Sequence, residues 1–245
     1  MLSHGWPAHL RPQAPDLREL RAAIATRDPG RLQKAVEGRA IDDVLQQVGT
    51  GATMALDLGA EQVEPLALSV INRLQMRREE GDGVLAEDLL ARLRHQPLAG
   101  RTVRVDLDML AEELASDPTW SSGGYIDLDT GEVIGEGSTD AALVGEDAAV
   151  DVDSDPDRWL WFSVVGSRDG WQDMADYAGR QQDADLRARL ERSIEGKGAF
   201  RRFRDIVQDE GLAEDWTSFS SDRRLGRARD LLAGMGIRVG GDRVG

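Results

Sequence analysis

Three acidic residues around one predicted turn have the types and spacing of a metal site. Asp127 and Asp129 alternate along a strand-like segment, and Glu132 follows just after Gly131. Carboxylate oxygens are the ligands that Mg²⁺ and Ca²⁺ prefer, and period-two alternation places the two aspartates on one face of a strand. The sequence therefore offers a divalent-metal site at Asp127, Asp129 and Glu132. The alternative is a solvent-facing hairpin in which Asp129 stabilises the turn.

A second group of candidate residues is basic and surrounds a predicted helix start near Gly198. Its members are Lys197, Arg201, Arg202 and Arg204. A helix N-terminus favours anions, but a nucleotide-binding phosphate loop is disfavoured because no glycine stands five residues before Gly196. The four cations predict instead a small patch for an anion or for nucleic acid. For Arg201 the alternative is an ion pair with Asp205, one helical turn later.

Several catalytic chemistries are excluded by composition. The chain has no cysteine, so disulfides, thiolate metal sites and cysteine nucleophiles are excluded. Its three histidines are His4, His9 and His95, so a histidine acid or base is absent from the whole second half. No catalytic residue is therefore predicted, and the only cofactor considered is Mg²⁺ or Ca²⁺. No apolar run reaches the length of a membrane helix, so we expect a cytoplasmic protein without a membrane partner.

The first hundred residues read as helical. A proline-rich arm over 1–15 precedes a helical domain over 16–98. Asp16 and Asp28 are expected to cap the first two helices, the second of which begins with Pro29. Apolar stripes then predict a third helix around 41–48 and longer ones over 65–79 and 84–94.

The second half mixes strands and helices and forms an α+β domain over 101–239, followed by a tail over 240–245. Its hairpin spans 124–134, where Gly131 can adopt the positive φ of the turn. Further strands are predicted near 103–105, 149–152, 159–165 and 237–239. Helices are predicted near 106–114, 167–181, 184–195, 198–210 and 221–234. The expected fold is a helical N-terminal domain followed by a small antiparallel sheet packed with a C-terminal helical cluster.

Aromatic residues of the second half are expected to be mainly core. Trp159 and Trp161 share one face of a predicted strand and Phe162 lies on the other, so both faces should be covered. Phe200 and Phe203 fall on one helix face with Val207 and are expected to be buried. The alternative is an aromatic pocket for a ligand, which would include residues such as Trp171 and Trp216.

The charge is distributed unevenly along the chain. The formal net charge is −15, and the stretch 103–157 holds sixteen acidic residues against the single basic residue Arg104. The rest of the chain is therefore neutral, and the tail over 187–243 is mildly basic. Separated charge of this kind is typical of an interaction surface or of a solvated region.

Three segments of the second half occur together in a known family. They are the hairpin over 125–133, the string Gly-Lys-Gly-Ala-Phe-Arg-Arg-Phe over 196–203, and Trp216 with Phe219 ahead of an arginine-rich helix that ends near Gly236. With this order and spacing, the region 103–239 resembles the bacterial uncharacterised protein family (UPF) 0158. The resemblance implies a small bacterial cytosolic protein and brings no established activity, catalytic residue or cofactor. The acidic insert over 135–157 departs from the family pattern.

These observations favour a non-catalytic function. We expect an interaction or regulatory module whose acidic middle and basic tail engage a protein or nucleic-acid partner, in an oligomeric state that the sequence does not specify. The alternative is a divalent-metal-dependent enzyme acting on phosphoesters. In that enzyme Asp127, Asp129 and Glu132 would hold the metal, while Lys197 and Arg201 would stabilise phosphate charge.

Overall fold

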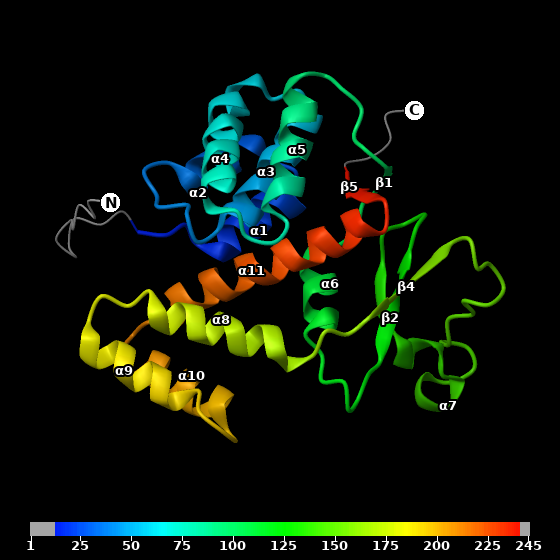
Figure 1. Ribbon diagram of the computed structural model, residues 1–245. Coiled ribbons are helices and arrows are strands. Elements are labelled where there is room, and N and C mark those ends of the chain that lie inside the picture. The colour runs from blue at the N-terminus through cyan, green and yellow to red at the C-terminus, as the bar shows by residue number, and fades with distance from the viewer. Residues whose placement is uncertain (1–12, 241–245) are drawn as a thin grey trace. The chain divides into compact units, whose positions relative to one another are not determined.

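The computed structural model describes residues 13–240 and divides into two units, 1–97 and 98–245 (Figure 1). Most of the predicted arm over 1–15 and the tail after residue 240 lie outside the described residues. Helices dominate both units, and strands occur only in the second of them within the described range. The predicted α+β class, with helices at both ends of the chain, is confirmed.

From residue 13 onward, unit 1 is built from five α-helices and one short 3-10 helix. They are α1 (Leu17–Ala25), α2 (Pro29–Val36), α3 (Leu45–Asp57), η2 (Glu61–Val63), α4 (Glu64–Arg77) and α5 (Asp82–Leu93). The side chains of Asp16 and Asp28 accept backbone N–H groups at the starts of α1 and α2, as the sequence predicts. One apolar core, with Leu20, Leu32 and Leu89 fully buried, joins all five helices.

Helix α3 differs from its predicted position. It begins at Leu45 and continues to Asp57, whereas the apolar stripe predicts a helix around 41–48. The helix is buried on nearly all sides, so its glycines and alanines carry no amphipathic pattern to read. A Cβ on Gly49 would lie 2.5 Å from Cδ2 of Leu85, so a larger residue there would force the Leu85 side chain of α5 to move.

Unit 2 contains two small sheets in its described part, residues 98–240. Strands β1 (Arg101–Val103) and β5 (Ile237–Val239) pair in parallel, although the first partners, Arg101 and Ile237, are 136 positions apart in the sequence. Strands β2 (Gly123–Asp127), β3 (Val133–Gly135) and β4 (Trp159–Ser163) form an antiparallel sheet in the order β3-β2-β4. The sequence predicts the antiparallel sheet but not the parallel pair.

The turn between β2 and β3 has the predicted conformation. Gly131 has φ of +82°, and a Cβ at this position would lie 1.9 Å from the carbonyl oxygen of Arg104. Glycine is therefore required both by the backbone angle and by the approach of the chain. In β4, however, Phe162 is fully buried while Trp161 is 39% exposed, so the prediction that both strand faces are covered is wrong. Trp161 instead packs edge-on against Tyr125 of β2.

The acidic insert holds little regular structure. It contains η3 (Glu136–Thr139) and the one-turn helix α7 (Ala141–Val144), and no strand forms at 149–152. The predicted strand is wrong because the Asp151 carboxylate accepts the N–H groups of Asp153 and Ser154, which closes a local turn. Most of the insert is exposed.

Five helices complete unit 2. They are α6 (Leu107–Leu114), α8 (Ser167–Gly179), α9 (Ala184–Ser193), α10 (Ala199–Asp209) and α11 (Ala213–Gly234). Helix α11 begins eight residues before the predicted start at 221, because Trp216 and Phe219 pack with Tyr177 and Phe203 in an aromatic cluster. It contacts α6, α8, α10 and β5 and contributes to both cores of the unit (Figure 1).

No helix within residues 13–240 combines the length and the apolar character needed to cross a membrane.

Candidate functional site

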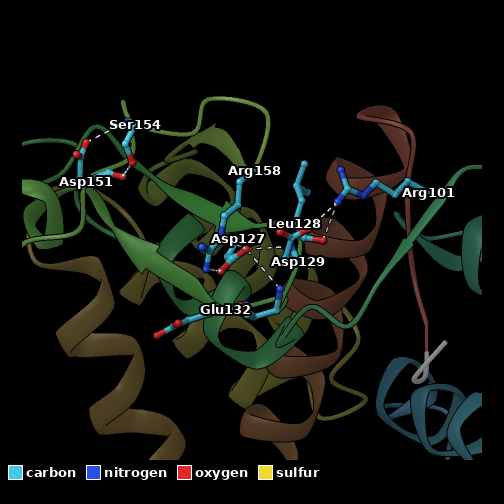
Figure 2. A network of polar contacts seen from close by, with 9 residues as sticks. Arg101, Asp127, Leu128, Asp129, Glu132, Asp151, Ser154 and Arg158 are labelled. Carbon is cyan, nitrogen blue, oxygen red and sulfur yellow. Dashed lines mark hydrogen bonds and ion pairs between the residues drawn. The ribbon is translucent and has the colours of Figure 1, made fainter. Parts of the chain in front are cut away.

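Asp127 lies at the end of β2 and is only 1% exposed. Its carboxylate accepts two hydrogen bonds from Arg158, from Nε to Oδ1 at 3.0 Å and from Nη2 to Oδ2 at 2.5 Å (Figure 2). Arg158 immediately precedes β4, which pairs with β2 in a register that sets Asp127 opposite Trp159. The sheet therefore brings together two charges that are 31 residues apart in sequence.

The same carboxylate organises the hairpin turn. Its Oδ1 accepts the N–H groups of Asp129 at 2.9 Å and of Thr130 at 3.4 Å. The Arg158 guanidinium, together with these N–H donors, holds the pKa of Asp127 well below its usual range. The prediction that this aspartate faces solvent is wrong, because the pairing of β2 with β4 covers it. Both of its oxygens are occupied by donors of the chain.

The other two predicted metal ligands point elsewhere. Oδ1 of Asp129 lies 3.3 Å from Nη2 of Arg101, which also donates to the carbonyl of Leu128 (Figure 2). Glu132 is exposed. Within the described range, no three histidine, aspartate or glutamate side chains are grouped as metal ligands, so the structure does not assemble Asp127, Asp129 and Glu132 into one site.

The buried pair predicts a pH-dependent loss of stability in Asp127→Asn. We expect this change to lower the free energy of unfolding at pH 7 by about 1–3 kcal/mol, because Arg158 loses its charge partner. The folded-state pKa of Asp127 is depressed, so its stabilisation is present above the unfolded-state pKa of about 3.9 and is lost as the pH falls below it. Urea unfolding at a series of pH values should show the difference between Asp127→Asn and wild type shrink below about pH 4.

Asp129→Asn is the matched control, since its exposed carboxylate makes only a surface ion pair and should change stability by less than about 1 kcal/mol. A pH-independent difference between Asp127→Asn and wild type would contradict the proposed role of the ionised carboxylate.

The predicted basic residues divide into one structural arginine and three exposed cations. Arg202 donates to the carbonyl oxygens of Ser193, Glu195 and Lys197 at 3.1, 2.5 and 2.6 Å, and so ties the end of α9 to the start of α10. Such contacts satisfy carbonyls that a helix end leaves without partners. Arg202 is therefore a structural residue.

Lys197, Arg201 and Arg204 form an exposed set that we call the α10 basic surface. None of the three has a carboxylate partner among residues 13–240. The predicted ion pair between Arg201 and Asp205 is absent from the described contacts and is wrong. Between these cations, Phe200 is 49% exposed, although the sequence predicts it to be buried with Phe203 and Val207.

A cavity of about 330 Å³ lies in unit 2 between α6, α8, α10 and α11, and we call it the α8–α11 cavity. Its apolar wall consists of Ala111, Leu114, Val165, Phe200, Trp216 and Leu231. Its polar wall comes mainly from the first turns of α8 and from one face of α11. The sequence predicts an aromatic pocket only as an alternative, and it does not predict these walls.

Ion pairs join helices α8 and α11 beside this cavity. Asp173 of α8 receives two hydrogen bonds from Arg227 of α11, at 3.0 and 2.6 Å, and is almost fully buried. Asp176 accepts from Arg223 at 2.8 Å, and Asp169 lies 3.8 Å from Arg227. Asp169, Asp173 and Asp176 follow each other at spacings of four and three residues, and Arg223 and Arg227 are four residues apart. Such spacings place side chains on one face of a helix, and the sequence analysis did not use this pattern.

Arg224 is the exception on this face of α11. It lines the α8–α11 cavity and is half-buried, and its single described hydrogen bond is a long one, 3.4 Å, to the Ser220 carbonyl of its own helix. Among the described residues it has no carboxylate partner. Neither composition nor spacing distinguishes it from Arg223 and Arg227.

Comparison of the chain with protein-family models, with curated proteins and with solved structures finds no match. The resemblance to the uncharacterised family 0158 therefore stays a prediction.

Proposed function

We propose that this chain is a non-catalytic interaction module of the bacterial cytoplasm that binds an acidic segment of a protein partner through the α10 basic surface. The observation that carries the proposal is an exposed aromatic ring, Phe200, set among cations that have no carboxylate partner in the described part of the chain. Aromatic residues and arginines are enriched among the residues that dominate binding energy at interfaces. A cation that makes no ion pair within its own chain can replace its bound water with a carboxylate of the binding protein.

Charge arithmetic favours a protein over a nucleic acid. Proteins that bind nucleic acid through its backbone commonly neutralise about 6–10 phosphates, whereas the α10 basic surface offers Lys197, Arg201 and Arg204. The whole chain carries a formal charge of −15 and exposes an acidic insert over 135–157, which repels a polyanion. Three cations beside an aromatic ring suit a short acidic peptide segment better.

No contact favours the alternative of a metal-dependent phosphoesterase. Both oxygens of Asp127 accept hydrogen bonds from Arg158, and Asp129 faces Arg101 instead of sharing a site with Asp127. An ion at this position would have to displace an arginine from a buried carboxylate.

The proposal predicts a charge-dependent partner. Tagged full-length protein should retain a partner from a bacterial lysate, and Lys197→Glu/Arg201→Glu/Arg204→Glu should reduce its recovery at least about tenfold, because three attractive contacts become repulsive. Quantitative mass spectrometry measures the recovery, and the absorbance ratio at 260 and 280 nm of the purified protein measures bound nucleic acid.

The matched control is Arg18→Glu/Lys34→Glu/Arg94→Glu, which makes the same charge change at exposed positions of unit 1. It should leave recovery unchanged. Equal recovery with both triple variants would contradict the proposed surface, and co-purification of nucleic acid with the wild-type protein would contradict the choice of a protein partner.

A further inference from the structure

The α8–α11 cavity has the size and lining of a small-molecule site. Its volume of about 330 Å³ falls in the range of ligand pockets, about 300–1,000 Å³. At roughly 30 Å³ for each non-hydrogen atom, taken from the volume of water, it accommodates about ten such atoms. The rings of Phe200 and Trp216 both line it, and aromatic rings pack favourably against another ring.

Four charged side chains line the cavity, Asp169, Asp173, Arg224 and Arg227, and the two aspartates both engage Arg227. Arg227 is matched by Asp173 and approached by Asp169. Arg224 lines the same cavity, and its one described contact is the long hydrogen bond to its own helix. A half-buried charge without a partner is costly, and the planar guanidinium fork fits a carboxylate with two parallel hydrogen bonds.

The first turn of α8 adds donors to the same wall. Gly166, Ser167 and Gly170 line the cavity, and no side chain caps this helix start. The amide groups of a helix start attract negative charge. Gly170 also allows the Phe200 ring to approach α8, because a Cβ there would lie 3.2 Å from Cε1 of Phe200.

Asp169 and Asp173 limit the charge that the cavity accepts. Both carboxylates line it, and both are engaged by Arg227. A dianion such as phosphate would face their repulsion with only Arg224 to offset it, whereas a single carboxylate matches Arg224 one to one. Because both aspartates engage Arg227, Arg224 is left to bind a single negative charge, and the cavity should therefore select a monoanion.

We propose that the α8–α11 cavity binds an aromatic monocarboxylate of about ten non-hydrogen atoms, with its carboxylate on Arg224 and its ring between Phe200 and Trp216. This site shares the Phe200 ring with the α10 basic surface but uses its own cation, Arg224, so it does not rest on the acidic-partner function. Ligand binding is measured on the purified full chain without any partner, so either proposal can fail while the other stands.

The test compares 3-phenylpropanoate with its neutral analogue 3-phenylpropan-1-ol by calorimetric titration of the full-length protein. The acid should bind the wild-type protein about ten- to a hundredfold more tightly than the alcohol, because only the acid makes a charge-assisted hydrogen bond. The indole N–H resonance of Trp216, assigned with Trp216→Phe, should shift on titration with the acid. Equal affinities for acid and alcohol, or an unshifted resonance, would overturn the proposal.

Arg224→Gln should remove this preference for the acid and leave the affinity for the alcohol unchanged. Arg94→Gln is the matched control, since Arg94 is exposed, does not line the cavity and should keep the preference. Inorganic phosphate at equal concentration should not displace the acid. A retained preference in Arg224→Gln, or displacement by phosphate, would overturn the assignment of a monocarboxylate, and the acid–alcohol comparison on the wild type decides the case if the variant does not fold.

Discussion

Replacing Asp173 by asparagine should lower the free energy of unfolding of unit 2 by about 3–5 kcal/mol, the usual cost of removing one partner from a buried ion pair. Both oxygens of Asp173 accept from Arg227, whose side chain is itself largely covered. Asparagine keeps the shape but removes the charge, so Arg227 loses both of its close carboxylate contacts with Asp173 and keeps the carboxylate of Asp169, 3.8 Å away. Urea unfolding followed by tryptophan fluorescence measures the change, since five of the six tryptophans lie after Pro97.

Asp176→Asn is the matched control for Asp173→Asn. Asp176 lies on the same helix and pairs with Arg223, but its side chain is 36% exposed, so its loss should cost less than about 1 kcal/mol. If Asp173→Asn costs no more than this control, the buried pair does not stabilise the contact between α8 and α11.

Phe203→Ala should destabilise unit 2 by about 3–5 kcal/mol, as large-to-small changes of a buried aromatic ring do. Phe203 is fully buried, and its ring centroid lies 4.8 Å from that of Trp216 and 6.2 Å from that of Tyr177. Alanine at this position leaves a void between α8, α10 and α11. Thermal and urea unfolding should both report the loss.

Phe200→Ala tests the same helix three residues earlier and should cost less than about 1 kcal/mol, because its ring is half-exposed at the edge of the α8–α11 cavity. We therefore expect the two variants to differ, because Phe203 is required for stability and Phe200 for binding. Similar destabilisation by both changes would mean that Phe200 is a core residue, as its helical spacing suggests.

The sequence predicts most helices because their signals are local. Capping carboxylates such as Asp16 and Asp28 act within one turn of chain, and Gly131 is recognisable from a turn flanked by alternating residues. Buried elements are harder to predict. Helix α3 is covered all round and lacks an amphipathic pattern, and the long start of α11 depends on an aromatic cluster gathered from three helices.

The roles of the candidate site residues depend on tertiary contacts far more than the positions of the helices do. Residue types identify Asp127 as a candidate metal ligand and Arg202 as a candidate anion-binding residue. Their roles follow instead from Arg158, which lies just before β4, and from the carbonyl groups at the end of α9. Charge pairing depends on which distant segments meet, and the spacing of residues does not specify it. For the same reason three arginines on one face of α11 look alike in sequence, and only the packing of α8 leaves Arg224 without a carboxylate partner in the described structure.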